Sequence, residues 1–88
     1  MFDDRQKPLI RALIYPVQFE RNPVDGIDHA LEVVVRIRAL GGSPDQYAAA
    51  VRAALRSDEP LAQLIPQRHS ESVIRTYLAE LGKRLPDD

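Results

Sequence analysis

Residues 43–56 read SPDQYAAAVRAALR and carry a complete start signal for an α-helix. Ser43 can cap the helix, Pro44 suits the first helical position, and Gln46 completes a capping box of the Ser-x-x-Gln type. Apolar side chains then recur at helical spacing, so that one face can enter a core while the opposite face meets water. The inward positions are Tyr47, Val51, Ala54 and Leu55, and the outward ones are Asp45, Arg52 and Arg56.

A similar signal starts the preceding segment. Asn22 is suited to cap a helix that begins at Pro23, and Asp25 would then lie near the positive end of the helix dipole. A wide apolar arc predicts a central helix that runs to Leu40 and stops at the glycine pair that follows. The β-branched residues 33–35 locally favour a strand, which is a competing signal.

Two interpretations are open for the N-terminal segment. Asp3 and Asp4 can cap a helix over residues 5–14, and this helix should end before Pro16, because proline disfavours helical geometry at the residue that precedes it. A strand over residues 9–19 is the competing interpretation.

The second half of the chain predicts one short and one long helix. Residues 57–60 break the helical pattern, and a short turn of helix through Ile65 should follow, closed by Pro66. Ser70 is the expected cap of the last helix. Its apolar residues recur at helical spacing, namely Val73, Ile74, Tyr77, Leu78, Leu81 and Leu85.

Together these segments predict an all-α fold, a compact bundle of four to five short helices. The 88 residues suffice for one core but not for two, so we expect a single domain over residues 1–88. Residues 1–4 and 86–88 should fray. Hydrophobic residues make up 44% and charged residues 28% of the chain, as is typical of folded globular domains.

Charge and composition exclude several kinds of partner. Twelve Lys and Arg against 13 Asp and Glu give a formal net charge of −1, so no overall field attracts nucleic acid or an anionic membrane. The absence of cysteine excludes disulfides and thiolate metal sites. The start of the chain lacks a secretion signal, and no apolar run is long enough to span a membrane. We therefore expect a cytoplasmic protein without a membrane partner.

No group of residues predicts an active site, a metal site or a cofactor site, and we expect a protein that is not an enzyme. Asp25 and His29, at i,i+4, predict a surface ion pair, because two ligands do not complete a zinc site. His69 is expected in a solvated loop. Ser70 and Ser72 beside it are the candidate nucleophiles, but both suit a helix start better.

A helix-turn-helix reader of DNA is an alternative for a small all-α chain. Its recognition element would have to come from residues 60–65, which are few and include no basic residue. The last helix carries a mixed, solvated set of charges, namely Arg75, Lys83, Arg84, Glu71 and Glu80. A nucleic-acid partner is therefore not expected.

Recognition of another protein fits the sequence best. The candidate partner-binding residues are Asp25, Asp28, Glu32, Tyr15 and Phe19. The three acidic residues are spaced to share or adjoin one outward arc, and a charged surface of this kind can orient a partner. The two aromatic residues lie in an irregular stretch flanked by prolines, where exposure is expected, whereas the helical spacing of Tyr47 and Tyr77 places them in the core. A merely solvated surface accounts equally well for each residue taken alone.

Residues 42–51, GSPDQYAAAV, followed by residues 57–61, SDEPL, resemble segments of small helical bacterial immunity proteins. Such proteins accompany contact-dependent growth-inhibition and related polymorphic toxins. The resemblance rests on size, helix content and helix starts with a cap, a proline and an acidic residue. It implies a cytosolic protein that binds and blocks one cognate toxin, often a nuclease, and it carries over no catalytic residue. The acidic candidate residues would then meet a basic nuclease cleft.

Two function classes stay open. The first is an immunity-type inhibitor that masks a toxin, and the second is a helical adaptor or self-associating module, for which a homodimer is expected. A nucleic-acid-binding regulator is a third and less favoured class.

Overall fold

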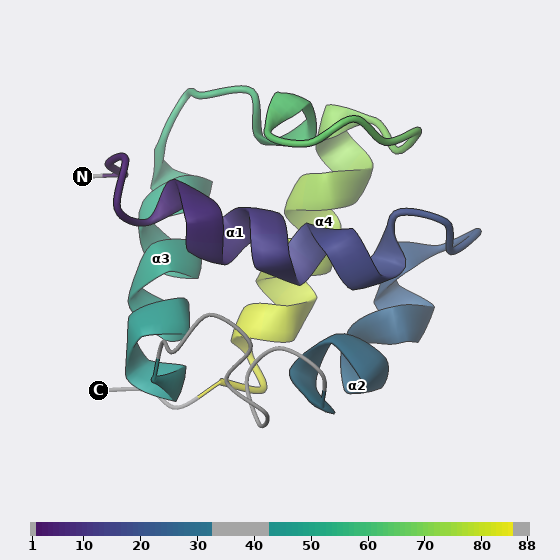
Figure 1. Ribbon diagram of the computed structural model, residues 1–88, viewed down its shortest axis with the longest axis horizontal. Coiled ribbons are helices and arrows are strands. Elements are labelled where there is room, and N and C mark those ends of the chain that lie inside the picture. The colour runs from purple at the N-terminus through teal and green to yellow at the C-terminus, as the bar shows by residue number, and fades with distance from the viewer. Residues whose placement is uncertain (1, 33–42, 86–88) are drawn as a thin grey trace.

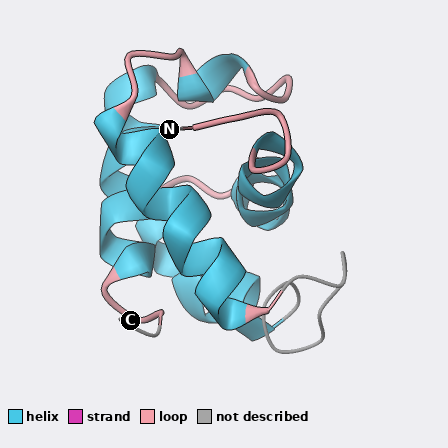
Figure 2. Ribbon diagram, turned by 90° about the vertical axis from the view of Figure 1, so that its left-hand side faces the viewer, coloured by secondary structure: helices cyan, strands magenta, loops and turns pink. Residues whose placement is uncertain are grey.

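The computed structural model describes residues 2–32 and 43–85, and every regular element within them is helical (Figure 1, Figure 2). The α-helices are α1 (Lys7–Ile14), α2 (Ile27–Ala30), α3 (Pro44–Arg56) and α4 (Glu71–Gly82). The 3-10 turns are η1 (Tyr15–Val17), η2 (Pro23–Gly26) and η4 (Leu61–Gln63). The radius of gyration is 11.4 Å, against about 12 Å for a compact chain of this length. The predicted all-α bundle is therefore confirmed.

The helices form two crossing layers. α3 and α4 run in opposite directions and pack against each other, while α1 crosses in front of them and packs on α3 (Figure 1). η2 and η4 both contact α4. η1, η2 and α2 contact one another at the end of the bundle that lies away from the N-terminus (Figure 1). This arrangement gathers residues 15–32 into one region.

One cluster of apolar side chains fills the space between these elements. It includes Phe2 and Leu85, which are only 6% and 7% exposed, so the two ends of the described chain meet the same core. Phe2 is thus anchored, although we expected residues 1–4 to fray. The largest side chains of the cluster that are fully buried are Tyr47, Tyr77, Ile10, Leu13, Ile14, Leu61, Ile74, Leu78, Leu81 and Val17.

The predicted caps at Asn22, Ser43 and Ser70 are present, whereas α1 begins only at Lys7, and Gln6 before it makes no side-chain cap hydrogen bond. At each of the three caps a side-chain oxygen accepts a hydrogen bond from a backbone N–H that would otherwise lack a partner. The three pairs are Asn22 Oδ1 with Val24 N (3.2 Å), Ser43 Oγ with Gln46 N (3.2 Å) and Ser70 Oγ with Val73 N (3.3 Å). Asp3 Oδ1 accepts from Gln6 N (3.2 Å) in the turn that precedes α1. The capping box is complete, because Gln46 Oε1 accepts in return from Ser43 N at 2.8 Å.

The N-terminal segment is helical, and the alternative strand over residues 9–19 is wrong. The α-helix ends at Ile14, as predicted, but the expected change of backbone geometry at Tyr15 does not occur. Tyr15 keeps helical dihedral angles (φ −52°, ψ −47°), and the chain continues into η1. Val17 is fully buried, so core packing outweighs the steric preference that proline imposes on the residue before it.

The predicted central helix begins where expected but not as an α-helix. Asn22 caps the 3-10 turn η2, and α-helical hydrogen bonding begins only at Ile27. Residues 33–40 of this predicted helix, including its end at Leu40, lie outside the described residues.

Two buried tyrosines, both predicted for the core, differ in how their hydroxyl groups are satisfied. Tyr77 OH donates to the carbonyl of Leu13 at 2.5 Å, which ties α4 to the last turn of α1. Tyr47 OH has no hydrogen-bond partner within the described part of the chain. Burial raises the pKa of both hydroxyl groups.

The two hydroxyl groups should therefore contribute differently to stability. Tyr77→Phe should lower the free energy of unfolding by about 1 kcal/mol, because the carbonyl of Leu13 loses its donor inside the core. Tyr47→Phe should leave it unchanged or raise it, because the lost hydroxyl is buried without a hydrogen bond. Urea unfolding followed by circular dichroism measures both variants, and equal losses would contradict the assignment.

Candidate protein-binding surface

The connection between α3 and α4, residues 57–70, is held to the start of α4 by one carboxylate. Glu71 Oε2 accepts a hydrogen bond from Leu61 N at 2.9 Å, and Glu71 Oε1 accepts one from Ala62 N at 2.8 Å. These two residues open the turn η4, where backbone N–H groups have no partner within the turn itself. Glu71 therefore caps a turn that lies nine and ten residues before it in the chain.

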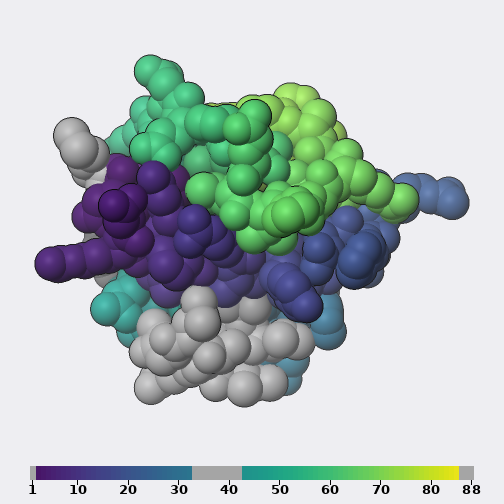
Figure 3. All heavy atoms as spheres, turned by 45° about the horizontal axis from the view of Figure 1, so that its top comes forward, coloured from purple at the N-terminus to yellow at the C-terminus, as the bar shows by residue number. Residues whose placement is uncertain are grey.

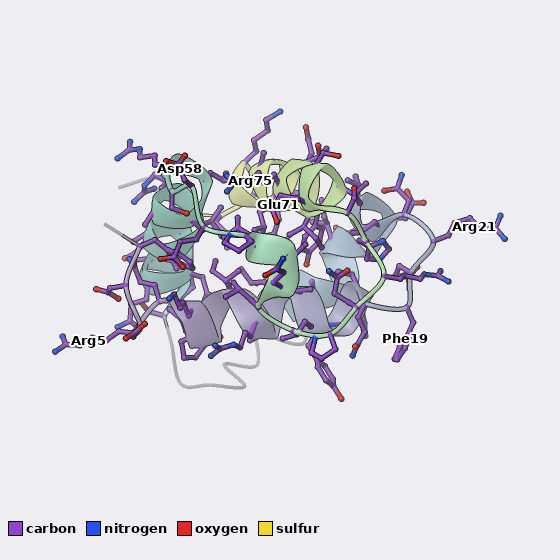
Figure 4. The ribbon with its side chains drawn as sticks, turned by 90° about the horizontal axis from the view of Figure 1, so that it is seen from above. Arg5, Phe19, Arg21, Asp58, Glu71 and Arg75 are labelled. Carbon is purple, nitrogen blue, oxygen red and sulfur yellow. The ribbon has the colours of Figure 1, made fainter. Side chains whose placement is uncertain are left out.

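Arg75 extends this contact to the end of α3. Its Nε donates to Glu71 Oε2 at 2.8 Å, and its guanidinium also donates to the carbonyls of Leu55 (3.3 Å), Ser57 (3.0 Å) and Glu59 (2.9 Å). The last carbonyls of a helix lack intrahelical partners, and a planar guanidinium can serve several of them at once. We call this pair the Glu71–Arg75 clamp; its two side chains lie next to each other at the start of α4 (Figure 4).

The clamp corrects the prediction of a solvated, mixed charge face on the last helix. The side chains of Glu71 and Arg75 are only 39% and 28% exposed, because the α3–α4 connection folds back over them. Spacing along one helix could not reveal this, since the partners are backbone groups far away in the sequence.

A second set of hydrogen bonds closes the connection on itself. Gln67 Nε2 donates to the carbonyl of Ala62 at 2.8 Å, and Gln67 Oε1 accepts from His69 N at 2.6 Å. Glu71 binds the N–H of Ala62, and Gln67 binds both the carbonyl of Ala62 and the N–H of His69. The position of His69 is therefore linked to the clamp through Ala62 and Gln67.

His69 and Arg68 then reach across to the turn that follows α1. His69 Nε2 lies 3.1 Å from the carbonyl oxygen of Val17, and because a carbonyl only accepts, the ring donates from Nε2. Arg68 Nη2 donates to the carbonyl of Phe19 at 3.4 Å. The prediction of a solvated loop at His69 is therefore wrong, since its half-buried ring tethers two parts of the chain.

The tethered segment, residues 15–22, is the aromatic turn. Tyr15 is 67% and Phe19 85% exposed, as the sequence predicts, and Phe19 points away from the body of the protein (Figure 4). Among the described residues, the one other exposed large apolar side chain is Val73, at 38%. All other large apolar side chains of the described residues are buried or half-buried. The aromatic turn therefore carries most of the exposed large apolar side chains of this part of the chain.

η2 packs on the aromatic turn so closely that any side chain at position 26 would displace Val17. A Cβ atom at Gly26 would lie 2.7 Å from Val17 Cγ1 and 3.3 Å from Glu20 Cγ. Val17 is fully buried, so its side chain cannot move aside into solvent. This close approach fixes η2, and the acidic residues that follow it, relative to the aromatic turn.

The acidic candidate residues lie beside the aromatic turn. Asp25, Asp28 and Glu32 are all exposed, on η2, on α2 and shortly after α2. Residues 15–32 hold four acidic side chains and one arginine, a net charge of −3 with histidine neutral, whereas the whole chain carries −1. Two arginines from elsewhere in the chain offset part of this charge, because Arg84 pairs with Asp28 and Arg68 lies at the carbonyl of Phe19.

The pairing of these acidic residues differs from the prediction. Asp28 forms an ion pair with Arg84 just beyond α4. In the described part of the chain no ion pair joins Asp25 to His29, which corrects the expected surface pair. Asp25 lies in a 3-10 turn with three residues per turn, so the i,i+4 spacing of an α-helix does not apply between them.

The candidate groups for nucleophilic catalysis have structural partners. Ser70 Oγ caps α4 and lies 3.3 Å from Ser72 Oγ, while the His69 ring binds the carbonyl of Val17. Within residues 43–85 no hydrogen bond joins His69 to either serine. His69 is therefore used as a tether and Ser70 as a helix cap.

In residues 2–32 and 43–85 no three side chains of the metal-binding kinds, His, Cys, Asp and Glu, gather where they could hold a metal ion. No helix of this part of the chain is long and apolar enough to cross a membrane. No protein-family model matches the sequence, and neither curated proteins nor solved structures yield a significant match. The functional argument therefore rests on the surface itself.

The clamp can be tested by removing its charge. Glu71→Gln keeps the size of the side chain but offers one carbonyl oxygen to the two N–H groups of Leu61 and Ala62. We expect the free energy of unfolding to fall by about 1 to 3 kcal/mol, because one partly buried donor is left without an acceptor. Glu80→Gln is the matched control, since Glu80 forms only a surface pair with Lys83 on the same helix and such pairs contribute about 0 to 1 kcal/mol. Equal losses in urea unfolding would overturn the role of the clamp.

The same substitution should alter the dependence of stability on pH. Partial burial raises the pKa of the Glu71 carboxyl, but the hydrogen bonds from Ala62, Leu61 and Arg75 together lower this pKa by more than burial raises it. The pKa therefore lies below the ordinary 4.5. The stabilisation is therefore complete above pH 4.5 and is lost as the pH falls through the folded-state pKa. The difference in unfolding free energy between the wild type and Glu71→Gln should shrink below pH 4.5, and a constant difference would contradict this.

Proposed function

We propose that the chain is a protein-binding module that acts in the cytoplasm as an immunity-type inhibitor, covering a cognate toxin by steric and electrostatic masking. The observation that carries this proposal is Phe19, which is 85% exposed on a turn held by hydrogen bonds to a distant part of the chain. A large aromatic side chain on a fixed turn is the type of residue that dominates binding energy in protein interfaces.

Charge supports a basic partner. The four acidic side chains of residues 15–32, which Arg21, Arg68 and Arg84 offset only in part, would attract a positively charged surface and raise the rate of association. A toxin that acts on nucleic acid has such a surface, because it must bind phosphates. Asp25, Asp28 and Glu32 would occupy positions that phosphates take in the toxin–substrate complex, which would block the substrate directly; Asp28 would exchange its ion pair with Arg84 for one with the toxin.

A self-associating module is the second candidate, because exposed apolar surface can also form a twofold interface. It predicts a dimer of the purified protein and no second protein after capture from the cells in which it is made. The inhibitor predicts one stoichiometric partner whose production arrests growth, and growth should resume when the chain is produced with it.

Charge reversal tests the electrostatic part of the proposal. A triple variant with Asp25→Lys, Asp28→Lys and Glu32→Lys should bind the captured partner at least about 10-fold more weakly, because attraction becomes repulsion. The control variant carries Asp45→Lys, Asp58→Lys and Glu80→Lys, which change the net charge equally at other sites. Calorimetric titration measures both, after circular dichroism has verified folding. Unchanged binding by the first variant, or equal weakening by both, would contradict a specific acidic contact.

A further inference from the structure

One dipeptide of the chain, Asp25–Gly26, has the composition that permits a spontaneous rearrangement of the backbone. The backbone nitrogen of the next residue can attack an aspartate side chain, and glycine hinders this attack least because it has no Cβ atom. Of the eight aspartates in the sequence, Asp25 alone precedes a glycine. The one asparagine, Asn22, precedes Pro23, which has no N–H to react. The sequence therefore concentrates this chemistry at position 25.

The structure leaves the Asp25 side chain open to solvent. Asp25 is exposed, and the segment that contains it, coloured blue, forms the surface at one end of the molecule (Figure 3). In the described part of the chain, no hydrogen bond or ion pair engages its carboxylate. The group that would react is therefore free to rotate.

The backbone of η2 nevertheless holds the reacting atoms apart. Ring closure requires Cβ, Cα and C of Asp25 and N of Gly26 to lie nearly in one plane, which the dihedral angles of a 3-10 turn do not provide. η2 is anchored, because Pro23 is fully buried and the turn packs on α4. The N–H of Ile27 also donates to the carbonyl of Val24, across the reacting peptide bond. The reaction therefore needs η2 to open first.

The reaction conserves all atoms of the chain. The nitrogen of Gly26 bonds to Cγ of Asp25, and one carboxylate oxygen leaves as water with the proton of that nitrogen and one proton from solvent. The resulting succinimide ring then takes up one water molecule and releases the proton. Attack of this water at Cγ restores aspartate, whereas attack at the main-chain carbonyl carbon breaks its bond to the nitrogen of Gly26 and leaves isoaspartate. Isoaspartate has the same mass and charge, but the backbone passes through Cβ and Cγ and is one atom longer.

The longer backbone does not fit between η2 and the aromatic turn. Gly26 lies so close to Val17 that even a Cβ atom there would approach Val17 Cγ1 to 2.7 Å. Val17 is fully buried, so it cannot give way into solvent. The hydrogen bond from Ile27 to Val24 closes a ring through the altered bond. An additional backbone atom would therefore displace Gly26 or break this hydrogen bond.

We propose that Asp25–Gly26 is a site of spontaneous isomerisation that the fold protects, and that isoaspartate formed there loosens η2 from the aromatic turn. The substrate is the chain itself, and the co-reactant is water. This inference is independent of the proposed function, because it concerns the chemistry of the chain in the absence of any partner.

The first test compares reaction rates of the full-length chain near neutral pH, in buffer and in guanidinium chloride. Peptide mapping with electron-transfer fragmentation distinguishes isoaspartate from aspartate. The reaction should be at least about 10-fold slower in buffer, because it proceeds only from the open form of η2. Asp25→Glu is the matched control: it keeps the charge but would have to close a six-membered ring, so it should yield no product at position 25. Equal rates in the two solvents, no product in guanidinium chloride, or equal product at the other aspartates would overturn the inference.

The second test measures the modified chain itself. Chains that carry isoaspartate are separated by chromatography after the incubation in guanidinium chloride, and they are refolded beside unmodified chains from the same sample. The modified chains should unfold at a lower urea concentration, because Gly26 cannot keep its contact with Val17. Identical unfolding curves would show that position 25 tolerates the longer backbone, and they would contradict the proposed loosening of η2.

Discussion

The hydrogen bonds that Glu71 accepts from Leu61 and Ala62 are the contact on which the rest of the described surface depends. A helix of twelve residues and a helix of thirteen are joined here by a connection with only one short 3-10 turn. Such a connection has many polar backbone groups and few side chains to bury, so packing alone would hold it weakly. The Glu71 carboxylate and the Arg75 guanidinium together form hydrogen bonds with five backbone groups. Four of these groups belong to the connection, and one is a carbonyl in the last turn of α3.

The aromatic turn owes its fixed position to this connection. Gln67 links Ala62 to His69, and from there the His69 ring and the Arg68 side chain reach the carbonyls of Val17 and Phe19. Residues that are about fifty positions apart in the sequence are thereby held together. The proposed contact surface is thus a product of the tertiary structure, although every exposed candidate residue comes from one segment of the chain.

The sequence predicted the local features well, since these depend on neighbouring residues. Caps at Ser43 and Ser70 need only the following three residues, and the exposure of Phe19 follows from a segment flanked by prolines. The Glu71–Arg75 clamp could not be predicted, because its acceptors and donors are backbone groups whose positions depend on the path of the connection. The 3-10 geometry of η2 was missed for a related reason: its tight approach at Gly26 is set by contact with Val17, not by helix propensity.

Amide hydrogen exchange of the wild-type protein, followed by NMR, tests most directly whether the clamp holds the connection. We expect the amides of Leu61 and Ala62 to exchange about as slowly as those in the middle of α4, because both donate to the Glu71 carboxylate. The opposite result, exchange at the rate of freely exposed amides, would mean that the connection opens independently of the helices. The aromatic turn would then lose the support of His69 and Arg68 and would be held only by the burial of Val17 and its contact with Gly26.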